Sequence, residues 1–328
     1  MAQKLHITTS PHLHCGDTIE KNMRWVVWAL MPALITSFFV FGMGALIVTA
    51  TSVLSCLFFE WFITRFILKR PSTLGDLSAT ITGILLAFNL PSNIPLYMIV
   101  VGALVAIGIG KMAFGGLGNN PFNPALVGRV FLLISFPARM TSWPVPAGIA
   151  ASYIDAETGA TPLNLIGQIA GGNTAAADQL PSLANLFIGN TGGCIGEVSA
   201  LVLLIGLVVL LCAKVITWHI PVSILSTVDV LTGLMWLINP VLYVNPLYHL
   251  CSGGLMLGAI FMATDYVTSP MTPKGMVWYG IGIGFLTVII RYFGSYPEGM
   301  SFAILIMNAV VPLINNWCKP KRFGEAAK

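Results

Sequence analysis

Long apolar runs alternate with short polar or proline-containing stretches along the whole chain. A helix needs about 20 apolar residues to cross about 30 Å of hydrocarbon, and a segment in lipid must satisfy its own backbone hydrogen bonds. β-Barrel strands would instead alternate apolar and polar positions over about ten residues. The pattern therefore predicts an all-α integral membrane protein of about ten transmembrane helices. We expect them near residues 25–43, 45–67, 77–90, 96–113, 122–136, 198–215, 222–238, 250–264, 276–290 and 302–316.

Composition agrees with this prediction and excludes other classes of protein. Of the 328 residues, 56% are hydrophobic and only 9% are charged, whereas a soluble domain carries about 25% charged residues. A soluble enzyme, a disordered chain and a nucleic-acid binder are therefore excluded. The net charge of +4 is spread along the chain without a basic block, so we expect lipid surroundings and no nucleic-acid partner.

The positions of lysine and arginine predict the orientation of the spans, because basic residues concentrate in cytoplasmic loops. If the N-terminus is cytoplasmic, all 16 basic residues except Arg129, Arg139 and Arg291 fall inside or at the inner boundary. Arg129 lies within a span, and only the other two fall outside. We therefore expect both termini in the cytoplasm and the long segment 138–196 on the outer face.

Five regions follow from this orientation, with a weak repeat between two of them. A cytoplasmic segment (1–23) precedes a first half of five helices (24–137), and the outer segment (138–196) precedes a second half (197–317) and a cytoplasmic tail (318–328). The sequence from Asn120 to Pro124 matches that from Ser269 to Pro273, and each opens a later span. Paired proline breaks of this kind indicate a binding site in the membrane interior. Parallel and inverted copies both remain open.

The stretch from Gly115 to Arg129 is a candidate part of that interior site. Its asparagine side chains offer amide donors and acceptors that suit the edge of a heterocycle, and Arg129 could offset negative charge on a reduced ring. The alternative is a structural loop whose polar groups satisfy the backbone hydrogen bonds of a broken helix. The candidate site comprises Asn119, Asn120, Asn123, Arg129, Ser269 and Thr272.

Ionisable residues within spans are costly and are usually functional or paired. Glu60 is predicted to pair with Arg65 near the inner boundary, and Asp76 to cap the third helix. Asp229 lies mid-span without a partner one turn away, so it is a candidate for an ion path or for a buried hydrogen-bond network. Asp265 is a second candidate for an ion path. The cysteines and histidines lack a second ligand pair, so no metal site is predicted.

The outer segment contains the sequence from Asp155 to Thr161, Asp-Ala-Glu-Thr-Gly-Ala-Thr. A threonine hydroxyl is a weak nucleophile unless a base or metal assists it. Gly159 and Ala160 would leave room for an enzyme pocket to close round Thr161, and Asp155 could orient the segment or a metal. From these residues alone, an ordinary turn is the simpler interpretation.

The motif Thr158-Gly-Ala-Thr161 nevertheless resembles the flavinylation signature of the NqrB/RnfD family of membrane redox subunits. The blocks 10–12, 120–132 and 262–275 are similar to blocks of the same family in the same order, so the resemblance runs nearly end to end. The short stretch before the first span favours the RnfD branch. The resemblance implies that a flavin transferase links FMN through its phosphate to Thr161, with Asp155, Thr158, Gly159 and Ala160 forming the motif. It also implies a noncovalent riboflavin in the bundle.

The same resemblance implies a function and partners. RnfD-like proteins are subunits of the Rnf complex of the bacterial inner membrane, which passes electrons between ferredoxin and NAD while translocating Na⁺ or H⁺. The partners would be the other Rnf subunits (A, B, C, E and G), and the chain would be inactive alone. It has no dinucleotide fingerprint, so NAD would bind a partner. The alternatives are an NqrB-like subunit of a sodium-pumping NADH:quinone reductase, and a non-redox transporter, because spans report architecture only.

Overall fold

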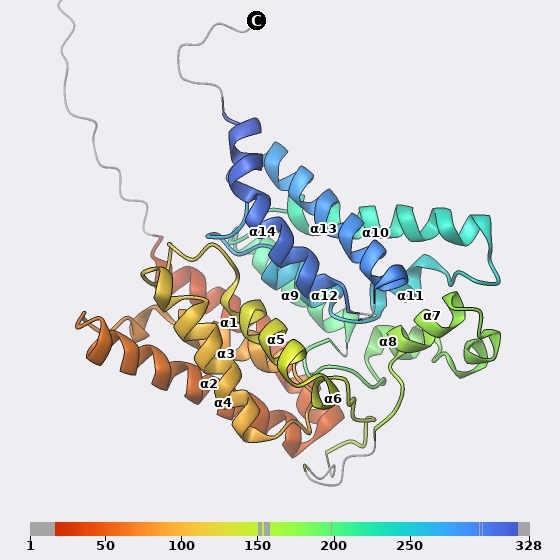
Figure 1. The fold of residues 1–328 in the computed structure, drawn as a ribbon, viewed down its shortest axis with the longest axis horizontal. Coiled ribbons are helices and arrows are strands. Elements are labelled where there is room, and N and C mark those ends of the chain that lie inside the picture. The colour runs from red at the N-terminus through yellow and green to blue at the C-terminus, as the bar shows by residue number, and fades with distance from the viewer. Residues whose placement is uncertain are drawn as a thin grey trace, which may run out of the picture.

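The computed structural model describes residues 17–149, 153, 158–197, 199–294, 296 and 298–320. Within these residues the chain is helical, and its only β feature is an isolated bridge between Pro144 and Thr158. Figure 1 shows the helices of the two halves and the smaller helices between them. The first half contains α1 (Ile19–Phe41), α2 (Met43–Phe62) with η1 (Ile63–Ile67), η2 (Leu74–Asp76), α3 (Ser78–Phe88), α4 (Leu96–Leu104) with η3 (Val105–Ile109), η4 (Met112–Phe114) and α5 (Pro124–Ser135).

The remaining helices belong to the middle segment and the second half. The middle segment forms α6 (Pro137–Met140), α7 (Pro162–Ala170), η5 (Thr174–Gln179) and α8 (Leu183–Ile188). The second half contains α9 (Ala200–Cys212), α10 (His219–Ile238), α11 (Pro246–Cys251), α12 (Leu255–Leu257) with η6 (Gly258–Met262), α13 (Pro273–Phe293) and α14 (Met300–Trp317).

Each predicted span coincides with helix in the structure, which confirms the all-α membrane fold. Among the residues that the structure describes, six helices are long and apolar enough to cross a membrane, and α3, α5 and α9 are shorter apolar helices. The predicted span 250–264 is the exception, because it is not continuous. It is interrupted between α11 and α12, where Gly253 adopts a φ of +67°. That left-handed conformation favours glycine and turns the chain between two half-helices.

The two matching proline elements open helices, as predicted. Asn123 caps α5 and Thr272 caps α13, each accepting a hydrogen bond from a backbone N–H of the first turn, at 3.1 Å and 3.2 Å. Pro124 and Pro273 occupy the first helical positions, where the missing N–H costs nothing. A π-helical turn precedes each element, η3 in the first half and η6 in the second. The repeat is therefore present in the local structure of both halves.

Small residues bring α10 and α13 into close contact. A Cβ atom added to Gly280 of α13 would collide with Ser223 of α10, and one added to Gly284 would lie 2.8 Å from the Cβ of Thr227. Close approach of this kind supplies the van der Waals contact that holds helices together in lipid. Held on this face by α13, α10 lies at the edge of the molecule in Figure 1.

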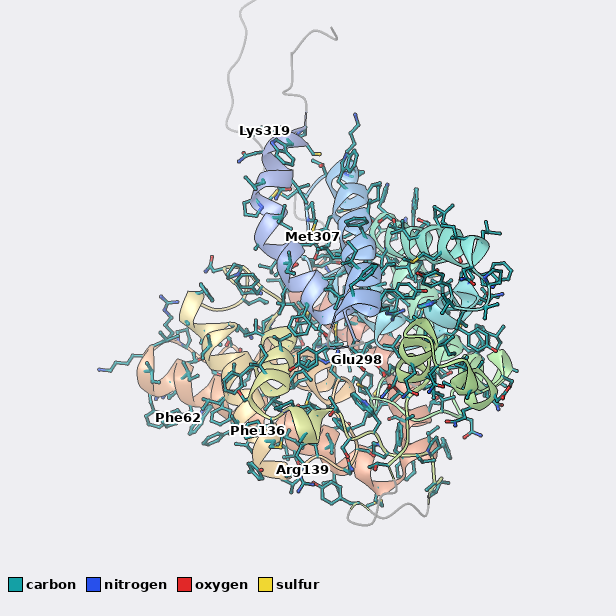
Figure 2. All side chains as sticks on the ribbon, turned by 45° about the vertical axis from the view of Figure 1, so that its right-hand side comes forward. Phe62, Phe136, Arg139, Glu298, Met307 and Lys319 are labelled. Carbon is teal, nitrogen blue, oxygen red and sulfur yellow. The ribbon has the colours of Figure 1, made fainter. Side chains whose placement is uncertain are left out.

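One hydrophobic core joins the two halves. It includes Phe88 and Leu126 of the first half and Phe261 and Ile304 of the second. Figure 2 shows Lys319 and Arg139 at opposite ends of the molecule, with Glu298 between them. The polar groups described below therefore lie at different depths of one continuous bundle.

Candidate cofactor sites

Thr161 lies at the N-terminus of α7, where the first candidate site begins. Its hydroxyl accepts a hydrogen bond from the N–H of Asn164 at 3.2 Å, and the residue is 7% exposed. Since a helix N-terminus presents backbone N–H groups and a positive dipole end, it favours an anion at this position. The local fold thus supports a phosphate group near the Thr161 hydroxyl.

The residues before Thr161 hold the motif in an extended loop. The N–H of Gly159 donates to the carbonyl of Trp143 at 3.0 Å. A Cβ atom on Gly159 would lie 2.9 Å from a methyl group of Val145. The glycine therefore allows the motif loop to pack closely against Val145, and it also leaves space on the side of the loop that faces away from the protein. Asp155 lies outside the described residues.

A small cavity lies beside Thr161. Its wall includes the hydroxyl-bearing residues Thr191 and Ser252 and the carboxylates of Glu197 and Glu298. Ser252 is 2% exposed, and its Oγ has no hydrogen-bond partner among the described residues. A buried hydroxyl without a partner is costly in isolation, so it is suited to a polar ligand group that enters the cavity.

A buried ion pair between the two halves borders this cavity. Arg129 of α5 forms a salt bridge with Glu298, which lies just before α14. The same guanidinium donates to Asn89 Oδ1 at 2.8 Å and to Ser301 Oγ at 2.6 Å. Arg129 is 3% exposed, so its charge is balanced by Glu298 within the protein. The structure therefore does not bring Arg129 to the other residues of the predicted interior site, because its side chain is engaged here.

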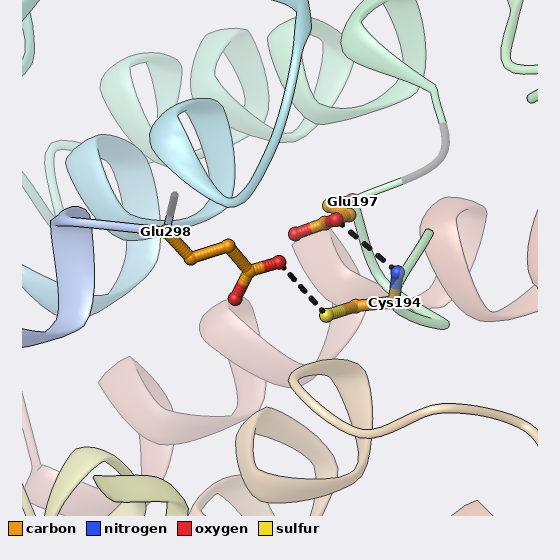
Figure 3. Close-up of side chains that lie close together, drawn as sticks. All are labelled: Cys194, Glu197 and Glu298. Carbon is orange, nitrogen blue, oxygen red and sulfur yellow. Dashed lines mark hydrogen bonds between the residues drawn. The ribbon is translucent and has the colours of Figure 1, made fainter. Parts of the chain in front are cut away.

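The Arg129–Glu298 pair adjoins a cluster of three side chains, Cys194, Glu197 and Glu298 (Figure 3). Their ligand atoms lie within 4.8 Å of one another. The backbone N–H of Cys194 donates to Glu197 at 3.2 Å, and its thiol lies 3.7 Å from Glu298. Burial, reinforced by the charge of Glu197, raises the pKa of the Cys194 thiol well above its ordinary value. In the structure these three groups belong to the hydrogen-bond network around Arg129.

Arg291 ties the broken span to α13. Its guanidinium donates to the backbone carbonyls of His249 at 2.7 Å and Ser252 at 2.9 Å. These carbonyls are freed where the helix is interrupted, and a broken helix in a membrane needs such partners. Arg291, which the predicted orientation places on the outer side, is buried within the protein at 6% exposure.

A second and larger cavity, partly open to solvent, lies among α3, α5 and η6. Its polar lining residues are Asn22, Ser78, Thr82, Lys111, Asn120, Asn123, Thr264 and Asp265, and its apolar ones include Val26, Leu85 and Phe261. Asn120 is 3% exposed, and its Oδ1 has no partner among the described residues. Mostly apolar walls with a few polar groups are typical of small-molecule sites.

A buried lysine lies at the wall of this cavity. Lys111 Nζ donates to Glu60 Oε2 and to Ser78 Oγ, both at 2.6 Å. Glu60 is fully buried and also accepts from Thr73 at 2.6 Å. The predicted pairing of Glu60 with Arg65 is therefore wrong, because Lys111 approaches from the end of η3 in space although it is distant in sequence. Asp76 accepts a hydrogen bond from the N–H of Ser78 at 2.9 Å, but Leu77 occupies the N-cap position of α3.

The structure brings together part of the predicted interior site. Asn120, Asn123 and Asp265 line the large cavity. Asn119 is exposed, and Ser269 and Thr272 serve the turn that opens α13 rather than the cavity wall. Lys111 and Ser78 also belong to this wall, although no pattern in the sequence indicated them.

Asp229 does not take part in a buried network within this chain. It lies on the exposed face of α10. Its place outside the bundle corrects the expectation of buried hydrogen bonds, and an ion path at Asp229 remains a prediction.

A family model matches residues 6–324 of the chain, which is nearly its whole length. The chain belongs to the NQR2, RnfD, RnfE family. This membership confirms the resemblance on which the flavin prediction depends.

Curated relatives of this NQR2, RnfD, RnfE family chain are similar over almost all of their length. One is the D subunit of the Na(+)-translocating ferredoxin:NAD(+) oxidoreductase complex of Acetobacterium woodii, 45% identical, with 98% of this chain and 95% of the relative covered. The D subunit of the proton-translocating ferredoxin:NAD(+) oxidoreductase complex of Clostridium ljungdahlii is 41% identical, with 97% and 96% covered. The D subunit of the ion-translocating oxidoreductase complex of Stutzerimonas stutzeri is 39% identical, with 95% and 94% covered.

Proposed function

We propose that this chain is a membrane redox subunit of an Rnf-type ion-translocating ferredoxin:NAD oxidoreductase complex and carries FMN esterified to Thr161. The observation that carries the proposal is the Thr161 hydroxyl, placed at a helix N-terminus beside a small polar cavity. The family and the names of the relatives support it. Relatives of similar identity are named for sodium and for protons, so the proposal covers transport of either ion.

Thr161 and its surroundings fit the phosphate end of FMN. The N-terminus of α7 would stabilise the phosphate charge, and the unpartnered hydroxyl of Ser252 is available as a donor. In maturation, a flavin transferase would form the bond from Thr161 Oγ to the flavin-side phosphorus of FAD and release AMP. Bound FMN supplies reversible one- and two-electron chemistry. The chain's own residues would position the flavin, and the Arg129–Glu298 pair would lie beside it.

Mass spectrometry of the peptide across Thr161 tests this proposal. In protein made with an active flavin transferase, we expect a mass increase equal to FMN less one water. Thr161→Ser keeps a hydroxyl and should retain flavin, whereas Thr161→Ala should lose it. Thr191→Ala is the matched control, because Thr191 lines the same cavity. An unmodified Thr161 under these conditions would count against the redox function.

We propose in addition that the larger cavity, lined by Asn120 and Lys111, holds the noncovalent riboflavin. The buried Oδ1 of Asn120 would accept a hydrogen bond from a ring N–H, and the apolar residues of the wall, such as Leu85 and Phe261, would cover the ring. The predicted orientation in the membrane supports this assignment: the cavity would face the cytoplasm, and Thr161 the outer side.

Release of flavin by denaturation of the purified complex tests the second site. Asn120→Leu removes the acceptor and should lower noncovalent flavin content several-fold, because a ligand donor is then left unpaired. Asn119→Leu is the control, since Asn119 is adjacent but exposed. Equal flavin content in both variants would place riboflavin elsewhere.

A further inference from the structure

The helix α10 has one packed face and one exposed face. Ser223 and Thr227 pack against the glycines of α13, and Ile224 is fully buried beside them. Opposite to them, Val222 is 47% exposed and Leu237 is 71% exposed. The exposed face is therefore apolar along most of its length, as expected for a helix in a membrane.

Asp229 interrupts that apolar face at its centre. It is the eleventh residue of the 20 in α10, about 15 Å along the helix axis from either end. Among the described residues, no side chain forms a hydrogen bond or ion pair with its carboxylate. A carboxylate facing lipid at this depth is strongly unfavourable.

Two carboxylates inside the bundle are paired with basic side chains. Glu60 is paired with Lys111, and Glu298 with Arg129. Asp229 differs because the chain itself offers no such partner within the part that the structure describes. Its neighbours on the exposed face are small or apolar: Ser226 one turn before it and Val230 next to it. A small residue lets a second helix approach closely.

We propose that this face of α10 docks against a membrane-spanning helix of another subunit, which presents a lysine or arginine to Asp229. The proposal rests on the proposed function in one respect, namely that the chain works inside a multi-subunit membrane complex. Positions 222, 226, 229, 230 and 237 recur at intervals that keep one stripe of the helix facing the partner. The pairing of Asp229 fixes the depth at which the two helices meet.

Photo-crosslinking in the assembled complex is the first test. A photoreactive amino acid replaces Val230, which is 59% exposed, and a second variant carries it at Leu54 of α2, which is 66% exposed and lies on an apolar face. We expect the Val230 variant to give one adduct with a membrane helix of another subunit that contains a basic residue. Adducts with lipid alone would overturn the proposal.

Substitution of Asp229 is the second test, read as the fraction of the chain that migrates with the intact complex on a native gel. Asp229→Leu and Asp229→Lys should lower this fraction about tenfold, in line with a polar contact between helices. Asp178→Leu, which removes an exposed carboxylate of the middle segment, should leave it unchanged. Normal assembly of Asp229→Leu would overturn the proposal, and loss of ion transport with normal assembly would favour an ion path instead.

Charge exchange separates the contact from general instability. Asp229→Lys combined with an acidic residue at the crosslinked basic position should restore assembly, whereas either change alone should not. Covalent flavin at Thr161 is measured in the same samples. If the Asp229 variants keep covalent flavin but do not assemble, the result supports the α10 contact and leaves the proposed function unaffected. If the unaltered chain lacks covalent flavin, the result contradicts the proposed function and leaves the α10 contact unaffected.

Discussion

At the scale of single residues, two buried ion pairs distinguish this bundle from an apolar one. Lys111 and Glu60 lie near the large cavity, and Arg129 and Glu298 lie beside the cavity of Thr161. Such pairs are expensive to bury, yet removal of one partner is costlier than burial of both. Each pair therefore constrains the charge state of the cavity that it borders.

Arg129→Met should destabilise the protein strongly, because Glu298 is left as an unpaired buried anion. We expect a loss of about 3–5 kcal/mol, seen as a lower midpoint of thermal unfolding in detergent. The double variant Arg129→Met/Glu298→Met should recover most of this loss. Lys21→Ala breaks an exposed pair with Asp17 and should change stability by at most about 1 kcal/mol. Equal effects of the two single variants would refute the role of burial.

At the scale of helices, close glycine contacts decide how the second half packs. Gly280→Ala adds a methyl group that collides with Ser223, and overpacking of this kind costs about 1–3 kcal/mol. Ser223→Gly in the same chain should restore stability, since it removes the obstructing atoms. Gly75→Ala is the control, because nothing lies within 4 Å of the added atom. Denaturation of the detergent-solubilised chain measures all three variants.

The helices themselves could be predicted from the sequence, but their pairing could not. Apolar periodicity indicated every span, and the proline elements indicated where α5 and α13 begin. The interruption at residues 252–254 was missed because an apolar run continues on both sides of it. Arg129 and Glu298 could not be paired from the sequence, since neither sequence distance nor hydropathy relates them. The predicted pairing of Glu60 with Arg65 fails for a different reason, because it rests on the basic residue that is nearest in the sequence.

At the scale of the whole molecule, orientation in the membrane determines which side each cavity faces. Gln168 of α7 and Lys319 after α14 are both exposed and are predicted to lie on opposite sides. In a variant without native cysteines, Gln168→Cys should react with a membrane-impermeant maleimide added outside spheroplasts. Lys319→Cys should react only after permeabilisation. The reverse pattern would place Thr161 in the cytoplasm, away from the expected outer side.

The cross-half ion pair has a consequence for biosynthesis. Glu60 and Lys111 are both translated within the first half, whereas Glu298 leaves the ribosome about 170 residues after Arg129. At about 5–20 residues per second, the arginine waits on the order of 10–30 s for its counter-ion. The nascent first half is consequently an incomplete folding unit, and the insertion machinery must shelter a membrane-embedded cation until translation is nearly finished.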